Sequence, residues 1–177
     1  IADEAGCAAL MDWIRGEFGG VDFLINNAGR SIRRAIEASY DRFHDFERTM
    51  RLNYFGCVRL INKLLPAMVE RKTGQIINIS SIGVLTNAAR FSAYVASKAA
   101  LDAYGRCLSA EVKHKNIEVT AIYMPLVRTP MIAPTKVYDY APAWSPEHAA
   151  DTVLKAILSR PKSVATALGT AAQLSYA

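Results

Sequence analysis

Tyr94 and Lys98 lie four residues apart, in the segment Tyr-Val-Ala-Ser-Lys. On a helix this spacing places both side chains on one face. A free tyrosine has a pKa of about 10, and a neighbouring ammonium lowers that pKa because it favours the tyrosinate. A phenol adjusted in this way can exchange protons near neutral pH. The pair alone is weak evidence, because a chain with eight tyrosines produces this spacing readily by chance.

Two polar segments each follow a short apolar run that is typical of a buried strand. They are Asn26-Asn27-Ala28-Gly29 and Ser81. Ligands bind outside the carboxyl ends of strands in an α/β sheet, where a serine hydroxyl can donate to a carbonyl oxygen that becomes negative. The amide of Asn26 can tie strand ends together, and the small Ala28 and Gly29 let backbone approach a ligand closely. Each segment is also typical of an ordinary turn.

Asn53 is an amide within an apolar helical segment, Leu52 to Gly56. A buried amide requires hydrogen-bond partners, so Asn53 is either a structural residue or part of a site. Cys57 follows one helical turn later. A small buried thiol is the favoured interpretation of Cys57, and a catalytic thiol that carries an acyl group is the alternative.

The composition describes one globular domain, residues 1–177, with 51% hydrophobic and 21% charged residues. No apolar run is long enough for a membrane span. Three widely spaced cysteines without a Cys-x-x-Cys pair predict neither disulfides nor a metal site, and they indicate a reducing compartment such as the cytoplasm. The net charge of +5 suits anionic small molecules, and no aromatic stacking platform accompanies the arginines, so no nucleic-acid binding is expected.

Apolar periodicity predicts four helices and four strands. The helices are expected over 2–18, 39–72, 93–114 and 146–160, and the strands over 21–25, 75–80, 117–123 and 164–166. Ser39 is predicted to cap the second helix and Pro66 to kink it or to start a new segment. Ser145-Pro146 is predicted to open the last helix. Strands that alternate with helices predict an α/β fold with a parallel sheet, right-handed crossovers and helices on both faces.

In order and spacing, Asn26 to Gly29, Asn53, Asn78 to Ser81 and Tyr94-x-x-x-Lys98 resemble the short-chain dehydrogenase/reductase family. The resemblance covers essentially the whole chain and implies a Rossmann-type doubly wound parallel sheet. It implies that Tyr94 exchanges the proton and that Lys98 lowers the Tyr94 pKa and holds the nicotinamide ribose. It further implies that Ser81 polarises the substrate carbonyl and that Asn53 supports a water-mediated proton relay.

The same resemblance implies a cofactor cleft lined by Asn26, Ala28, Gly29, Tyr94 and Lys98. Thr129 matches a threonine that contacts the nicotinamide carboxamide in this family. The chain has Met124-Pro125 where the family usually has Pro-Gly before that threonine, so the loop is expected to be stiffer.

Three segments, 21–34, 43–48 and 124–135, look like one branch of the family, the bacterial NADPH-dependent long-chain fatty acyl-CoA reductases. This resemblance implies NADPH as cofactor, an acyl-CoA as substrate and a fatty aldehyde as product. It also implies that Ser81, Arg128 and Met131 contact the substrate. Cations could hold the coenzyme A phosphates, and apolar side chains could cover the acyl chain. The cations are Arg30, Arg33, Arg34, Arg128 and Lys136, and the apolar residues are Met131, Ile132, Val137, Tyr138 and Trp144. A solvated arginine cluster and a self-packed loop are the alternatives.

The chain starts at Ile1 and has no glycine-rich phosphate-binding turn before residue 21, so it is expected to be a fragment that lacks the first strands of the sheet. Val21–Ile25 would then form an uncovered apolar edge, and the segment alone would neither fold well nor bind cofactor. A reductase of ketones, 3-oxoacyl thioesters or secondary alcohols, and a non-catalytic truncated module, are the alternative functions. By resemblance, the helices over 39–72 and 93–114 are expected to form contacts in a homo-oligomer.

Overall fold

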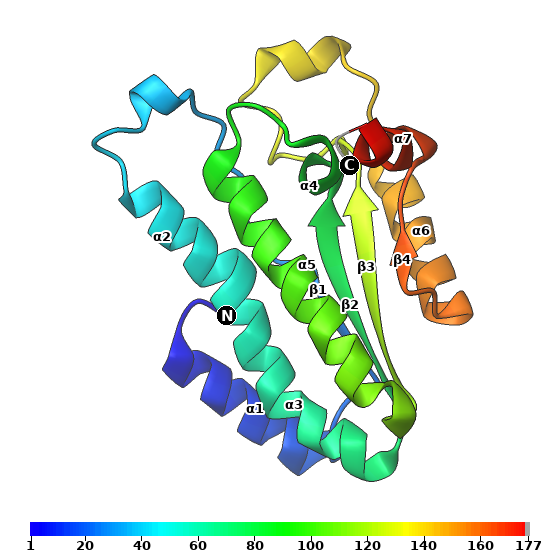
Figure 1. Ribbon diagram of the computed structural model, residues 1–177. Coiled ribbons are helices and arrows are strands. Elements are labelled where there is room, and N and C mark those ends of the chain that lie inside the picture. Colours follow the sequence, from blue (N-terminus) through cyan, green and yellow to red (C-terminus); the bar gives the residue numbers. More distant parts are fainter. Residues whose placement is uncertain (176–177) are drawn as a thin grey trace.

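The computed structural model describes residues 1–175, which form a four-stranded parallel sheet with helices packed on it (Figure 1). The strand order is the chain order, β1-β2-β3-β4. The strands are β1 (Phe23–Asn26), β2 (Gly74–Ser81), β3 (Ile117–Met124) and β4 (Ser163–Val164). All three neighbouring pairs are parallel, which confirms the predicted sheet.

The helices that join these strands occupy most of the predicted ranges. The longer ones are α1 (Glu4–Phe18), α2 (His44–Met50), α3 (Cys57–Arg71), α5 (Ser92–Val112) and α6 (Pro146–Ser159). Two further helices, α4 (Ile82–Thr86) and α7 (Ala167–Ser175), have no counterpart in the sequence prediction. The described residues also form three short 3₁₀ segments, η1 (Ile36–Ala38), η3 (Lys113–Lys115) and η4 (Lys136–Tyr140), and one π-helical turn, η2 (Arg51–Gly56).

The two faces of β2 pack against different helices, because side chains alternate along a strand. Ile76 packs with Met68 of α3 and Leu108 of α5. Ile77 packs on the other face with Ala156 of α6. Helices therefore cover both faces, as predicted.

The crossover through α6 has the opposite hand from the other two. The chain steps across the sheet in one direction, yet α3 and α5 lie on one face and α6 on the other. The prediction of right-handed crossovers throughout is therefore wrong for the β3–α6–β4 connection. The long segment 125–145 makes this possible, because it carries the chain over the carboxyl edge of the sheet before α6 begins (Figure 1).

The predicted helix over 39–72 is three elements instead of one. Ser39 does not cap it, because the Ser39 hydroxyl donates to the backbone oxygen of Ala35 at 2.9 Å and closes the η1 turn. Pro66 lies inside α3 and does not break it, because Leu64 and Met68 on either side are buried and hold the helix in place. The irregularity lies earlier, in the π-helical turn η2 (Arg51–Gly56) between α2 and α3.

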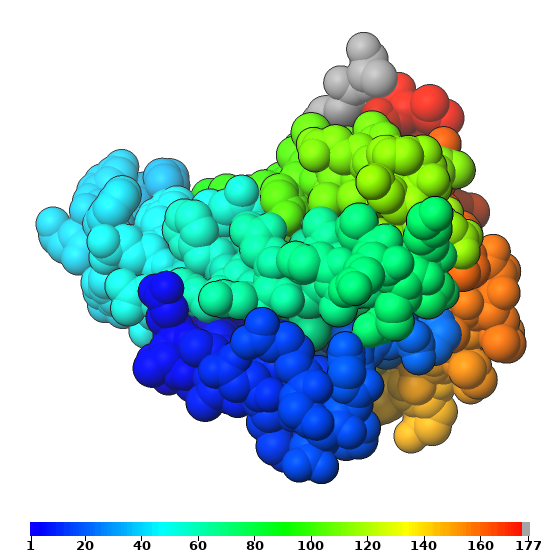
Figure 2. All heavy atoms as spheres, turned by 90° about the horizontal axis from the view of Figure 1, so that it is seen from below, coloured from blue at the N-terminus to red at the C-terminus, as the bar shows by residue number. Residues whose placement is uncertain are grey.

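Two further sequence predictions are confirmed, the N-terminal cap of α6 and the exposed edge of the sheet. Ser145 caps α6, since its hydroxyl accepts from the backbone N–H of His148 at 3.2 Å and Pro146 is the first helical residue. β1 is an edge strand, and its Phe23 and Ile25 side chains are exposed, as expected for an uncovered apolar edge. In Figure 2, α1 lies along α3, where the buried Met11 packs against Leu64.

Candidate active site

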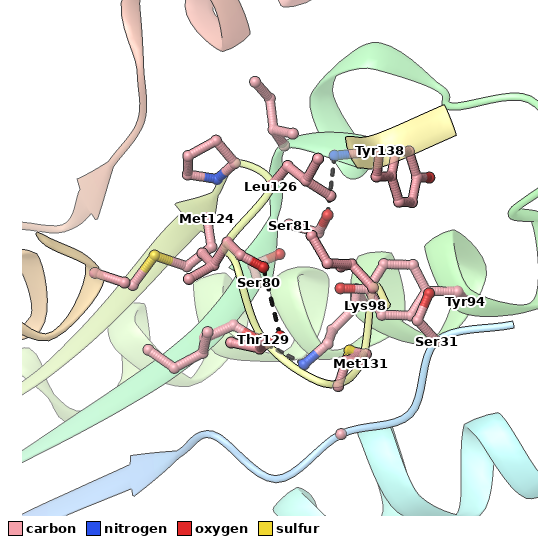
Figure 3. Close-up of a pocket in the computed structure, with 18 of the residues that line it drawn as sticks. Ser31, Ser80, Ser81, Tyr94, Lys98, Met124, Leu126, Thr129, Met131 and Tyr138 are labelled. Carbon is pink, nitrogen blue, oxygen red and sulfur yellow. Dashed lines mark hydrogen bonds between the residues drawn. The ribbon is translucent and has the colours of Figure 1, made fainter. Parts of the chain in front are cut away.

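Ser81, Tyr94 and Lys98 line one cleft at the carboxyl end of the sheet (Figure 3). Ser81 is the last residue of β2, and the other two lie one turn apart on α5. The cleft has a volume of about 1540 Å³ and is closed on one side by the segment that follows β3. The Ser81 hydroxyl accepts from the backbone N–H of Gly83 at 3.1 Å and is close enough to Tyr94 to affect the pKa of the phenol. Residues that are distant in the sequence therefore meet as the motif predicts.

Burial is the largest cause of the pKa shifts of Tyr94 and Lys98. Burial raises the pKa of Tyr94, and the nearby Ser81 side chain lowers it only in part. Burial also lowers the pKa of Lys98, against a smaller opposing effect of Cys57. The predicted lowering of the Tyr94 pKa by Lys98 is wrong for this structure, because the Lys98 ammonium is directed to the backbone oxygen of Ile79 at 2.7 Å. Tyr94 is therefore protonated at neutral pH and equipped to donate a proton.

Asn53 lies in the π-helical turn η2 and is fully buried behind the cleft. Its Oδ1 accepts from the backbone N–H of Arg30 at 2.8 Å, and its Nδ2 donates to the backbone oxygen of Arg30 at 2.9 Å. Nδ2 also donates to the hydroxyl of Ser97 at 2.9 Å, which in turn donates to the backbone oxygen of Tyr94 at 2.7 Å. Asn53 thus ties the loop after β1 to α5, and its amide hydrogens already have protein partners.

Gly29 is the member of the Asn-Asn-Ala-Gly run that comes closest to Lys98. A Cβ atom on Gly29 would lie 3.3 Å from Asn53 Oδ1 and 3.4 Å from Lys98 Nζ, so a side chain there would crowd the cleft. Asn26 is buried behind the wall, where its Nδ2 donates to Asn78 Oδ1 at 2.9 Å and joins the ends of β1 and β2. Asn27 also lines the cleft, whereas Ala28 and Asn26 do not.

The space beside Gly29 and Lys98 fits one half of a dinucleotide. The absence of a side chain at Gly29 leaves room against the ammonium, which is suited to bind hydroxyl groups of a ribose. Thr129 lines the same cleft and can present its hydroxyl there. Among residues 1–175 no glycine-rich turn joins a strand to a helix N-terminus in the manner that binds the phosphates of a dinucleotide.

Thr129 and Met131 reach the cleft as predicted, but Arg128, which directly precedes Thr129, does not. The Arg128 guanidinium donates to the backbone oxygens of Tyr138 at 3.0 Å and Ala141 at 2.9 Å. The parallel donors of the guanidinium therefore hold η4 against the segment that follows β3. A substrate phosphate would have to compete with these backbone oxygens for Arg128.

The three arginines predicted after the first strand have different surroundings. Arg30 is exposed and does not line the cleft. Arg33 lines the cleft. Arg34 instead pairs with the buried carboxylate of Asp45 at 3.0 Å, together with Arg42 at 3.3 Å and Arg48 at 2.6 Å. Burial raises the pKa of Asp45, but the hydrogen bonds and charges of the three arginines outweigh this effect and lower the pKa. The expectation that Arg34 is free for a coenzyme A phosphate is therefore not supported, because a carboxylate already occupies its guanidinium.

Four of the five residues predicted to cover an acyl chain line the cleft, namely Met131, Ile132, Val137 and Tyr138. Trp144 does not, because its ring packs on His148 with centroids 4.3 Å apart. The sequence prediction missed further apolar lining residues, Ile82, Phe91 and Val95, which belong to α4, the segment after it and the start of α5. The apolar residues directly after Ser81 were the available signal for this part of the lining.

Cys57 is fully buried and does not line the cleft. Burial raises the pKa of the Cys57 thiol, so the thiolate needed for acyl transfer is disfavoured. The described residues contain no group of three or more His, Cys, Asp or Glu side chains that could hold a metal ion. Within residues 1–175, no helix has the length and apolar character to cross a membrane.

Comparison with known protein families and sequences gives consistent matches. The family model for short chain dehydrogenases matches residues 1–137. The chain is 72% identical to a fatty acyl-CoA reductase of Acinetobacter baylyi over 157 residues, which are 89% of this chain and 53% of that protein. It is 48% identical to a fatty acyl-CoA reductase of Mycobacterium tuberculosis over 166 residues, or 93% of this chain and 56% of the other. The chain spans about half the length of the curated relatives it matches.

Solved structures with the same fold are also similar. A short-chain dehydrogenase from Streptomyces avermitilis matches with a TM-score of 0.85 and 28% identity, over 99% of this chain and 72% of that one. A gluconate 5-dehydrogenase from Burkholderia cenocepacia, solved with NADP and tartrate, matches with a TM-score of 0.69 and 25% identity. The latter match covers 75% of this chain and 51% of the other.

Proposed function

The chain belongs to the short-chain dehydrogenase family, and we propose that it carries the catalytic centre of an NADPH-dependent reductase that converts a long-chain fatty acyl-CoA to a fatty aldehyde. The observation that carries the proposal is that Ser81, Tyr94 and Lys98 line one cleft, which is also lined by apolar side chains. The names of two relatives favour this substrate class over others.

In this proposal Ser81, Tyr94 and Lys98 each have one role in the reaction. NADPH, when bound, supplies the hydride. The Ser81 hydroxyl donates to the thioester oxygen and orients the carbonyl group. Tyr94, kept protonated because burial raises its pKa, donates its proton to that oxygen as negative charge develops. Lys98, next to Gly29, holds the ribose hydroxyls. Collapse of the resulting hemithioacetal returns the oxygen's proton to Tyr94 and breaks the carbon–sulfur bond. Coenzyme A leaves as a thiolate, which takes a proton from water, and the aldehyde is free.

The walls of the cleft suit the two ends of an acyl-CoA. Met131, Ile132 and Val137 form an apolar side against which an acyl chain can pack. Arg33 and Lys136 are exposed cations at the same cleft and make no ion pair with residues 1–175. They are the remaining candidates for the coenzyme A phosphates.

A reductase of ketones or 3-oxoacyl thioesters is the second candidate, because the same three residues serve a ketone equally well. The similarity to a gluconate 5-dehydrogenase supports it. A non-catalytic module is less favoured, since a scaffold has no need of a serine, a tyrosine and a lysine converging in one cleft. We also propose that the protein acts in the cytoplasm, in line with its free cysteines, and forms a homo-oligomer.

The two candidates differ in what the whole protein reduces. NADPH oxidation should be followed with palmitoyl-CoA and with a 3-oxoacyl thioester in parallel, with NADH as the alternative cofactor and with trapping of the aldehyde. Faster oxidation with palmitoyl-CoA together with released aldehyde is expected. Turnover of the 3-oxoacyl thioester alone would replace the first candidate by the second.

Tyr94→Phe tests the role of the phenol within either candidate. Turnover should fall by about 100-fold or more, because the proton donor is lost. The matched control is Tyr104→Phe, since Tyr104 lies on the same helix and its hydroxyl bonds to Asn62 outside the cleft. Equal rates for the Tyr94→Phe variant and the unaltered protein would refute the assignment.

A further inference from the structure

The positive charge of the molecule is concentrated around the mouth of the cleft. Three segments contribute residues to its lining: 30–43 through Ser31 and Arg33, 87–91 through Ala88 and Phe91, and 124–145. They contain seven of the 21 Lys and Arg residues and three of the 16 Asp and Glu residues. The net charge of the three segments is therefore +4, compared with +5 for the whole chain. Figure 1 shows η1 and η4, which belong to two of these segments, at the same end of the molecule as the arrowheads of β2 and β3.

The same segments expose large apolar side chains at their tips. Tyr40 is 75% exposed and Tyr140 is 93% exposed. Ile36, Phe43 and Val137 are exposed as well. The segment around residues 36–45 projects from the body of the molecule, as the light-blue and cyan spheres of Figure 2 show. Exposed tyrosine and aliphatic tips interspersed with cations are typical of surfaces that enter the headgroup layer of a membrane.

Several of the cations at the mouth are free to act on a partner. Arg34 and Arg42 are bound to Asp45, and Arg128 to backbone oxygens. Arg33, Arg90 and Lys136 are exposed and form no ion pair with any residue of the described chain, 1–175.

We propose that the cleft mouth docks on an anionic lipid surface, with Ile36, Tyr40 and Tyr140 in the headgroup layer and the free cations over acidic headgroups. The occupant is inferred from the charge complementarity, because basic residues next to a membrane are attracted by acidic lipids. No membrane-spanning helix is needed for this mode of binding.

Docking in this orientation would open the cleft toward the lipid. An amphiphilic acyl substrate could then enter, and an apolar product could leave, without crossing bulk water. This consequence rests on the proposed function, whereas the docking itself rests on the charge and exposure of the three segments alone.

The test is co-sedimentation of the whole protein, as its gene encodes it, with vesicles of phosphatidylcholine alone and of phosphatidylcholine mixed with phosphatidylglycerol. Binding to the mixed vesicles, weakened by added salt, is expected because salt screens the attraction. A Tyr40→Asp, Tyr140→Asp double variant should bind at least about tenfold more weakly, since it removes two apolar tips and adds two negative charges.

Leu158→Asp is the matched control, because Leu158 is 76% exposed and lies at the far end of α6. The neighbouring Arg160 donates to the backbone oxygen of Gly74 at the start of β2, at the opposite end of the strands from the mouth. Equal binding to neutral vesicles, no binding to the mixed vesicles, or an equal loss in the Leu158→Asp variant would overturn the proposal.

Thermal melts and turnover of a short, water-soluble acyl-CoA separate the possible failures. Tyr40 and Tyr140 do not line the cleft, so the double variant should keep its melting temperature and its turnover in the absence of vesicles. Turnover without vesicle binding would overturn the docking proposal alone. Vesicle binding without any reductase activity would overturn the proposed function alone.

Discussion

Asn53 forms hydrogen bonds with both polar groups of the Arg30 backbone, accepting from its N–H at 2.8 Å and donating to its oxygen at 2.9 Å. This pair of bonds fixes the loop after β1 where Gly29 lies beside Lys98, so that a Cβ atom on Gly29 would come within 3.4 Å of Lys98 Nζ. The further bond from Asn53 to Ser97 fixes the same loop to the turn of α5 that carries Tyr94. One buried amide thus sets the distance between the cofactor side and the catalytic side of the cleft.

Replacement of Asn53 by alanine should therefore damage stability and cofactor binding together. The variant loses two partly buried bonds to the Arg30 backbone and the buried bond to Ser97, which should lower the free energy of unfolding by about 2–4 kcal/mol. Urea unfolding and a fluorescence titration with NADPH measure the two effects. Asn62→Ala, at an exposed amide on α3, is the control and should change neither. An Asn53→Ala variant with unchanged NADPH affinity would show that the loop is held by other contacts.

Lys98→Met should separate stability from activity. Burial lowers the pKa of Lys98, so the folded state disfavours its ammonium, and the variant should be at least as stable as the unaltered protein at about pH 7. The penalty is complete below the folded pKa and disappears as the pH rises toward the unperturbed value of 10.5, so the advantage of the variant should shrink over that range. Urea unfolding at about pH 7 and about pH 10 measures this trend.

Turnover of the Lys98→Met variant should fall by about 100-fold or more, because no ammonium is left to hold the ribose. A variant that is much less stable than the unaltered protein at neutral pH would mean that the bond from Lys98 to the Ile79 oxygen outweighs the cost of burial.

Asp45→Asn should destabilise the loop that precedes α2. The buried carboxylate holds Arg34, Arg42 and Arg48, and its loss should lower the free energy of unfolding by about 3 kcal/mol at neutral pH. Because the folded pKa of Asp45 lies below the unperturbed value of 3.8, this contribution is present above pH 3.8 and is lost as the pH falls through the folded pKa. The difference between variant and unaltered protein should therefore shrink in acid.

Urea unfolding at neutral pH and in acid checks this prediction. Asp12→Asn is the control, because the Asp12–Arg15 pair is exposed on both sides and should contribute little. A difference that is independent of pH would assign the effect of Asp45→Asn to lost packing instead of lost charge.

Arg128→Lys should loosen η4 although it retains the positive charge. A lysine ammonium cannot reproduce the fork that reaches the backbone oxygens of Tyr138 and Ala141 together. We expect the KM for the acyl substrate to rise by about tenfold, with little change in NADPH affinity, and cleavage by protease within 131–145 to be faster. An unchanged KM, or a change that appears only on removal of the charge in Arg128→Gln, would favour direct contact with a substrate phosphate.

The placement of Ser81, Tyr94 and Lys98 was predictable from the sequence because it depends on local periodicity. The spacing of Tyr94 and Lys98 on a helix and the place of Ser81 at the end of a strand are set by elements that short segments specify. The partners of Arg34 and Arg128 were not predictable, because Asp45 and the backbone oxygens of η4 are reached only through the folding of irregular segments. The direction of the Tyr94 pKa depends on burial, which no spacing reveals.

Helix boundaries failed for a related reason. Ser39 has the chemistry of a cap, but the choice of its partner, Ala35, depends on how the preceding loop closes. Pro66 breaks helices in isolation, yet here the buried neighbours Leu64 and Met68 decide the outcome. Tertiary packing overrides local preference at both positions.

The π-helical turn η2 holds one residue more than the same rise of α-helix would need. The extra residue is absorbed locally, so α2 can keep Asp45 toward its arginines while α3 keeps Met68 toward the sheet. Removal of a single residue from Arg51–Gly56 would leave a continuous α-helix in which both flanking halves retain their packing. The amide of Asn53, however, would turn away from the loop, so a shortened chain would fold around a misaligned centre.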